Sequence, residues 1–424
     1  MVIVMAMGCS KSDNEDADSL IRTVPADASA VAVVNLEHLI DILGSSTDGS
    51  TIKLSEDAQK FIDKSSASEE DKKAAKDICN GNTGIALNSI VYFSAARSYI
   101  TGLLNDPNKF AEYVSNIYAN DSETKIPVVE ENGAKTIGDV IVIGNQFWIC
   151  ITGTPDTEQL KYYANLNERQ SFYSTKASSI LLESDKAVAF VADINRATSS
   201  IPEAGSFKMG LSLMFEDLAY LSGNVDYQKN TLKVTARLLN SDMNPSKLLL
   251  PTEKIDTELI KSFGGTADSY FAVALGKKLI KKISDLAGMA MGNSSNQIVK
   301  TLEQIDGTVA VRGDSHMKSF EAKVQTTGND FAELSTIIQN LFGMDVTRTG
   351  NVITAKSNKE EITGNISADD AADKLKGAWI GGISSDFPTK GITSVARLSS
   401  EKGSLRFELE TEGDINAIMT TMMK

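Results

Sequence analysis

The two histidines, His38 and His316, are the side chains of this chain best suited by type to acid–base catalysis. His38 stands between Leu36 and Leu39 in a segment with helical apolar spacing, which indicates a structural helix. His316 follows Gly313-Asp314-Ser315, which is typical of a turn between strands. Adjacency in sequence does not build a Ser-His-Asp triad, and the chain has no Gly-x-Ser-x-Gly elbow. The sequence therefore predicts no catalytic residues and no enzyme.

Carboxylates are the other candidate acid–base groups, since the chain has 56 Asp and Glu residues. The clusters Asp13–Asp18 and Asp369-Asp370 lack the alternating ligand spacing of a calcium loop. We interpret the first as part of a tether and the second as a helix start, and we expect no metal and no cofactor. A pair of carboxyls about 5–10 Å apart hydrolyses glycosides but leaves no sequence signature. Glycan hydrolysis at the cell surface or in the periplasm therefore stays open as an alternative.

Cys9 is the most informative residue. It follows an apolar run, Met1–Met7, and Gly8, and it precedes a polar, acidic stretch. This pattern is that of a bacterial lipobox, in which the thiol is lipidated and the peptide is cut before it. A buried first strand is the competing interpretation, and the basic region of a signal peptide is missing. We predict lipidation at Cys9, with residues 1–8 as a signal remnant and 9–20 as the lipidated Cys and a flexible acidic tether.

Cys79 and Cys150 are the remaining cysteines. Outside the cytoplasm the two thiols can pair in a disulfide. Cys150 lies in the apolar run Gln146–Ile151, where a free Cys behaves as a small buried hydrophobe. Sequence leaves both alternatives open.

Composition favours an anchored globular ectodomain, with 42% hydrophobic and 23% charged residues. The net charge of −14 argues against a nucleic-acid partner, because phosphate binding needs clustered cations. The basic segment Lys277–Lys282 has apolar residues at helical spacing and is predicted to be a solvated helix face.

An internal duplication is indicated by the order of elements. A strand and a helix are predicted from Val31 and again from Tyr270. Further strands correspond in placement, as the following segments show: 89–93 with 307–311, 187–192 with 377–382, and 231–239 with 404–410. Alternating strands with covering helices predict two tandem, duplicated α+β domains of mixed or antiparallel sheet, with helices on one face.

The predicted boundaries place the first domain at 21–245, a linker at 246–258 and the second domain at 259–424. Helical insertions are expected in the first domain, at residues 55–79 and 155–173. Trp148 and Trp379 lie in apolar strand runs and are predicted to be core residues.

A resemblance to a known group of proteins rests on three features: the lipobox, the element order and the segment Arg22–Ala28. The chain resembles a group of Bacteroidetes lipoproteins that share a domain of unknown function, over roughly residues 20 to 424. The resemblance implies an outer-membrane, lipid-anchored protein on the cell surface or the periplasmic face, and it brings no catalytic residue. It also makes Asp18-Ser19-Leu20 a candidate O-glycosylation site at Ser19. The expected function is non-enzymatic binding or scaffolding, with an unknown protein or glycan as partner.

Overall fold

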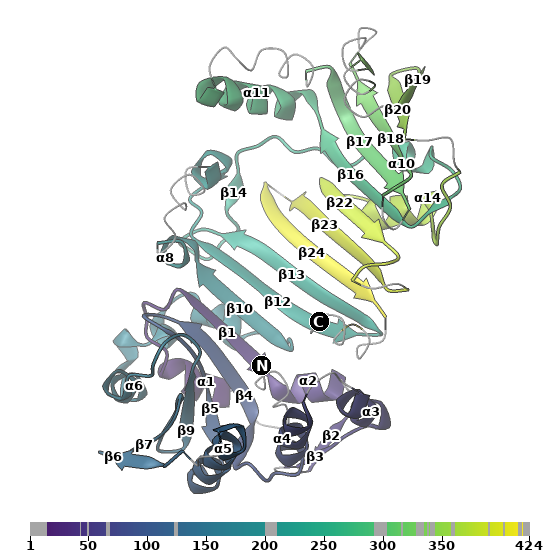
Figure 1. Cartoon of the computed structure of the whole chain (residues 1–424). Coiled ribbons are helices and arrows are strands. Elements are labelled where there is room, and N and C mark those ends of the chain that lie inside the picture. The colour runs from purple at the N-terminus through teal and green to yellow at the C-terminus, as the bar shows by residue number, and fades with distance from the viewer. Residues whose placement is uncertain are drawn as a thin grey trace. The chain divides into compact units, whose positions relative to one another are not determined.

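The computed structural model describes the chain except for residues 1–14, 43, 49–50, 65–67, 123–125, 200–209, 292–302, 315–316, 328–334, 337–338, 340–343, 358–360, 389–390, 402, 414–417 and 419–424. The chain divides into two compact units. The first comprises residues 1–208, 219–229 and 239–244, and the second 209–218, 230–238 and 245–424. Each unit is a mixed α/β structure in which the recorded strand pairings are antiparallel (Figure 1).

The first unit is built on an antiparallel sheet in the order β12–β10–β1–β4–β5–β9–β8–β7–β6. Its strands are β1 (Ala30–Asn35), β4 (Ile85–Ser94), β5 (Ser98–Leu104), β6 (Val129–Glu131), β7 (Ala134–Ile137), β8 (Val140–Ile143), β9 (Gln146–Cys150), β10 (Val188–Asp193) and β12 (Tyr220–Gln228). A separate hairpin joins β2 (Ser46–Asp48) and β3 (Thr51–Lys53). Its helices are α1 (Glu15–Arg22), α2 (Leu36–Ile42), α3 (Glu56–Lys64), α4 (Glu69–Cys79), α5 (Pro107–Ser122), α6 (Thr157–Ala164), α7 (Ser178–Leu182) and α8 (Ile194–Ala197).

The second unit has an antiparallel sheet in the order β13–β24–β23–β22–β16–β17–β18–β20–β19. Its strands are β13 (Thr231–Leu239, the last residue excepted), β16 (Ser269–Leu275), β17 (Ile305–Gly313), β18 (Phe320–Thr326), β19 (Asp345–Thr349), β20 (Val352–Lys356), β22 (Ile380–Ser384), β23 (Thr393–Glu401) and β24 (Ser404–Glu412). Short strands are β11 (Phe215–Glu216), β14 (Lys247–Leu248), β15 (Thr266–Ala267) and β21 (Ile366–Ser367), and the helices are α10 (Thr257–Lys261), α11 (Lys277–Met291) and α14 (Ala368–Leu375).

The strand orders of the two units correspond along the chain. In the first, β1 lies between β10 and β4, and β5 and β9 follow β4. In the second, β16 lies between β22 and β17, and β18 and β20 follow β17. A helix precedes the central strand in both units (α1 and α10), and another precedes its neighbour (α7 and α14).

Helices cover one face of each sheet, as amphipathic elements require. In the second unit, α10 and α14 bury Leu259, Ala372 and Leu375 against Tyr270 and Ile383 of the strands. Ser367 caps α14 by accepting a hydrogen bond from the Asp370 backbone at 3.1 Å, so Asp369-Asp370 opens a helix as predicted. Both tryptophans are buried, as their apolar strand runs indicated.

Two boundaries differ from the sequence expectation. The tether was expected to reach residue 20, but α1 begins at Glu15, and Leu20 and Ile21 are fully buried in the first core. The apolar residues of this short acidic helix supply enough buried surface to fix it. Residues 246–258, predicted to be a linker, belong to the second unit: β14 pairs with β11 and β24, and Ile255 is buried.

Candidate functional site: an apolar groove on the second unit

The residues singled out in the sequence do not gather into one site. Cys9 and His316 lie outside the described residues. Ser19 is exposed on α1, where its hydroxyl donates to the Asp16 carbonyl at 2.8 Å. The segments that the structure describes contain no helix long and apolar enough to span a membrane and no group of three or more His, Cys, Asp or Glu arranged for a metal.

Cys79 and Cys150 are free thiols, so the disulfide that the sequence left open is not formed. Cys79 ends α4 and packs with Ile40 and Ile78, whereas Cys150 packs in the core that contains Trp148. Burial raises the pKa of both thiols, which lowers their reactivity.

His38 makes a structural hydrogen bond. Its Nε2 lies 2.8 Å from Oδ1 of Asp226 on β12, and Lys186 Nζ lies 3.3 Å from Oδ2. The Tyr227 backbone also donates to Asp226 at 2.9 Å, and Gln228 does so at 3.0 Å. Burial opposes ionisation of Asp226, but these hydrogen bonds outweigh it and lower the pKa of the carboxyl. The carboxylate is therefore saturated with donors, and the pair joins α2 to β12.

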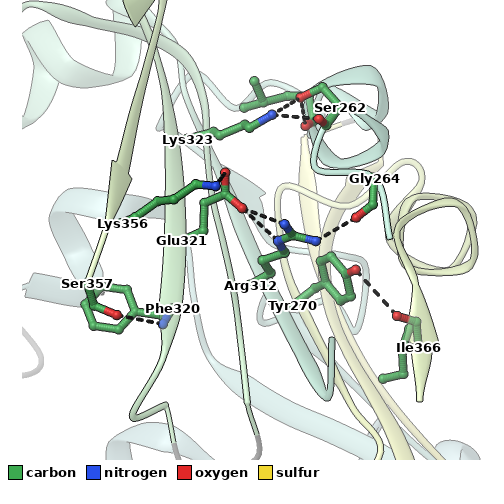
Figure 2. Close-up of polar contacts among 11 residues, drawn as sticks. Ser262, Gly264, Tyr270, Arg312, Phe320, Glu321, Lys323, Lys356, Ser357 and Ile366 are labelled. Atoms are coloured by element: carbon green, nitrogen blue, oxygen red, sulfur yellow. Dashed lines mark hydrogen bonds and ion pairs between the residues drawn. The ribbon is translucent and has the colours of Figure 1, made fainter. Parts of the chain in front are cut away.

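A buried polar network lies in the second unit (Figure 2). Arg312 on β17 donates from Nε and Nη2 to Glu321 Oε2 on β18, at 2.9 and 2.7 Å. Its Nη1 also donates to the Gly264 carbonyl at 2.6 Å, and Lys323 donates to the Ser262 carbonyl at 2.7 Å. Both carbonyls follow the C-terminus of α10, where cations are favourable. The network thus fixes α10 to the sheet and offers no free nucleophile or base.

The open face of the sheet in the second unit carries a different feature, which we call the apolar groove. It is a hollow of about 350 Å³ formed by strands β16, β22, β23 and β24 and by the loop after β22. Its lining is as follows: Ser269, Tyr270, Phe271, Ile380, Gly381, Gly382, Ile383, Ser384, Phe387, Ser394, Ala396, Arg397, Leu398, Phe407 and Leu409. Ligand sites are typically concave and mainly apolar, with a few polar groups, so the groove has the general character of a binding site.

Strand register builds the groove. Phe271, Gly382, Ala396 and Leu409 are consecutive cross-strand partners and therefore form one row. Ile380, Leu398 and Phe407 form the next row on the same face. Four strands at about 4.8 Å spacing make each full row about 14 Å long. The result is a rigid apolar strip that crosses the strands.

Three phenylalanines of the groove are exposed to an unusual degree. Phe271, Phe387 and Phe407 show 48%, 57% and 38% of their surface. Isolated exposed hydrophobics are common, but a contiguous apolar patch marks an interaction or ligand site. At one end the groove meets hydroxyls that bond one another, since Ser269 donates to Ser384 at 3.0 Å.

The other face of the same strands is charged. Arg397 Nη2 lies 3.0 Å from Glu410 Oε1, and Lys233 Nζ lies 2.8 Å from the same oxygen. Glu408 is held by Arg406 at 2.9 Å. Burial opposes ionisation of Glu410, but Lys233 and Arg397 outweigh it and lower its pKa. Glycoside hydrolysis needs a carboxyl whose pKa is raised, so Glu410 does not suit that role.

Sequence reasoning missed the groove. The segment 404–410 was predicted to be a strand, and Leu405, Phe407 and Leu409 alternate with polar residues in it. Alternation alone does not say whether an apolar face is covered. The adjacent Gly381 and Gly382 within a strand were the available signal, because glycine in a strand often marks a close approach or an open space.

Comparisons with known proteins identify no family. No protein-family model matches the chain, and no curated protein matches it. Among solved structures, two crystal forms of a protein named TP0453 align over 83% of this chain and 95% and 96% of theirs, at 11% and 9% identity. Their TM-scores are 0.28 and 0.29. A third form covers 52% of this chain and 79% of its own, with 12% identity and a TM-score of 0.31. Scores this low carry no conclusion about fold or function.

Proposed function

We propose that this chain is a non-enzymatic, lipid-anchored protein of the bacterial outer membrane that binds an aliphatic chain in the apolar groove. The observation that carries the proposal is the apolar groove itself, where Phe271 and Phe407 of the sheet and Phe387 of the adjoining loop are exposed. Burying such side chains under a ligand contributes about 25 cal/mol per Å² of apolar surface. The groove therefore gains most from a ligand that is itself apolar.

The chemistry of the lining favours an acyl chain over a charged or sugar ligand. The hydroxyls at the end of the groove bond within the protein: Ser394 donates to the Phe387 carbonyl at 2.8 Å and shares a hydrogen bond with Thr411 at 2.9 Å. Arg397 touches the groove, but its guanidinium is engaged by Glu408 and Glu410. A polar ligand would lose its hydration without gaining partners, at a cost that an alkyl chain does not incur.

Two further parts of the proposal concern the whole chain. The corresponding strand orders of the two units support a duplication of one α+β fold. Lipidation of Cys9 would hold both units at a membrane, and anchoring through more than one acyl chain is stable. Labelling with a radioactive fatty acid tests the anchor: Cys9→Ser should abolish incorporation, whereas Cys150→Ser should leave it unchanged.

Binding of a fluorescent fatty acid, 11-(dansylamino)undecanoic acid, tests the groove. We expect saturable binding to the full chain, weakened about tenfold or more by Phe271→Ser combined with Phe407→Ser. These side chains are exposed, so their replacement should leave thermal stability nearly unchanged. Tyr162→Ser is the matched control, because Tyr162 is an aromatic residue with 51% exposure on α6, in the first unit.

Two results would overturn the proposal. One is equal binding by the groove variant and the Tyr162 variant, which would show that the probe reports general surface hydrophobicity. The other is the absence of saturable binding to the unmodified chain. The exposed phenylalanines would then be assigned to binding a protein partner instead.

A further inference from the structure

A further hollow of the second unit, of about 570 Å³, differs in character from the apolar groove. It is lined by Lys254, Lys376, Arg397, Ser399, Ser400 and Glu408, with the backbone of Gly377 and Ala378. Lys254 precedes α10, Lys376 ends α14, and the others come from β23 and β24. Three elements therefore bring three cations to one concave surface, which we call the basic hollow.

Among the described residues, the two lysines of the basic hollow have no acidic partner. Both are exposed, and neither ammonium group makes an ion pair or hydrogen bond with the part of the chain that the structure describes. Other lysines of the described segments differ in that respect: Lys233 and Lys374, for example, form ion pairs with Glu410 and Glu412. Like charges that line one hollow repel each other, and a bound anion removes that cost.

The single carboxylate of the basic hollow is already neutralised. Glu408 Oε1 lies 2.9 Å from Arg406 and 3.5 Å from Lys233, and Oε2 lies 3.5 Å from Arg397. It therefore faces three cations within the charged face of the sheet. None of these three cations is Lys254 or Lys376, so Glu408 does not neutralise either lysine.

The end of α14 also leaves room for an anion. The carbonyls of its last turn, which would repel an anion, are taken: Arg397 Nη1 donates to Lys374 O at 3.3 Å, and the Ala378 N–H donates to Leu375 O at 3.2 Å. Gly377 then turns the chain with φ +83°, and a Cβ placed there would meet nothing within 4 Å. The wall at this turn is open backbone rather than packed side chain.

We propose that the basic hollow binds a phosphate group, either as inorganic phosphate or as a phosphate monoester. The two ammonium groups match a dianion with several acceptor oxygens, and charge-assisted hydrogen bonds are the strongest of their kind. This site is additional to the apolar groove and uses lysines that do not line it.

Titration calorimetry at low salt and neutral pH tests the site, with the full chain and two separate ligands, inorganic phosphate and glycerol 3-phosphate. We expect saturable binding that weakens about tenfold or more in Lys254→Gln combined with Lys376→Gln, since each lysine supplies a charge-assisted bond. Binding of inorganic phosphate alone identifies the free anion as the ligand. Binding of glycerol 3-phosphate, alone or as well, identifies the phosphate group within a larger molecule.

Lys277→Gln combined with Lys278→Gln is the matched control. These lysines are exposed on α11 in the same unit, and among the described contacts their ammonium groups also lack an acidic partner. Both double variants remove the same charge. If both weakened phosphate binding equally, the effect would come from the net charge of the protein, and the proposed site would be overturned. Failure of both ligands to bind the unmodified chain would overturn it as well. Neither result bears on the apolar groove, whose ligand carries no phosphate.

Discussion

Phe271 and Gly382 stand directly opposite each other on β16 and β22, and the phenyl Cδ2 lies 3.6 Å from the point where a Cβ of residue 382 would be. The missing side chain therefore leaves an open position between Phe271 and Ala396, the next residue of the row. The adjacent Gly381 faces the other way, toward Leu375 of α14. Two neighbouring glycines thus serve opposite faces of one strand.

Alanine substitution should change stability in opposite directions at Gly381 and Gly382. A Cβ at residue 381 would lie 2.8 Å from Leu375 Cδ2 and 3.2 Å from the Ala396 carbonyl, so Gly381→Ala should lower the free energy of unfolding by about 1–3 kcal/mol. A Cβ at residue 382 would meet the Tyr270 carbonyl at 3.4 Å, which is ordinary contact. Gly382→Ala should raise stability by up to about 1 kcal/mol, because glycine weakens a strand interior. Urea unfolding of both variants measures the difference.

A bulkier residue at the same position tests the groove without removing any contact. Gly382→Val places a branched side chain between Phe271 and Ala396, and valine suits a strand. We expect the folded protein to lose most of its affinity for the fluorescent fatty acid. Tight probe binding by a folded Gly382→Val variant would place the acyl chain elsewhere.

The Arg312–Glu321 pair should dominate local stability in the second unit. The side chains are only 11% and 6% exposed, so Glu321→Gln leaves a guanidinium buried without its anion. Breaking such a pair costs about 3–5 kcal/mol. Asp242→Asn is the contrasting variant, because the Lys176–Asp242 pair is 67% and 64% exposed and should contribute about 1 kcal/mol or less. Similar urea midpoints for the two variants would contradict this ranking.

Much of the strand order could be predicted from sequence because it depends on local apolar patterns. The runs at Val31, Tyr270 and Thr231 all form strands, and Asp106-Pro107 opens α5, with Asp106 accepting from the Asn108 backbone at 3.0 Å. These features need only alternation, a cap and a proline. Duplication itself stays a prediction, supported by the corresponding strand orders.

The sites were not predictable, because they depend on which faces remain uncovered. Phe407 alternates with charged residues just as a core residue does, and only the assembled sheet shows that it is exposed. Lys254 and Lys376 are 122 positions apart in the sequence, and only the fold brings them to one hollow. Leu20 and Ile21 were hidden by the acidic residues around them, which suggested a tether rather than a helix.

The two buried cysteines should react slowly with thiol reagents in the folded chain. Burial raises the pKa of Cys79 and Cys150, so at neutral pH both should react with a thiol reagent far more slowly in the folded chain than in denaturant. A Cys9→Ser variant leaves only these two thiols to be counted. Titration in denaturant without reductant should find both, and a mass lower by two hydrogens would show instead that they pair.

We expect the contribution of Asp226 to the stability of the first unit to be lost at acid pH. Its pKa in the folded state lies below the ordinary value of 3.8, because donors including His38 and Lys186 outweigh burial. A depressed folded pKa stabilises the fold at pH values above the unfolded pKa, and that contribution is lost as pH falls through the folded pKa. Asp226→Asn should therefore be clearly less stable than the unmodified chain at neutral pH, with the difference shrinking below pH 3.8.

Thermal unfolding from neutral pH to below pH 3.8 measures whether the stabilities of the two proteins converge. Asp185→Asn is the control, because Asp185 is exposed and contacts the same Lys186. A stability difference between Asp226→Asn and the unmodified chain that stayed constant with pH would show that Asp226 acts through packing and not through its charge.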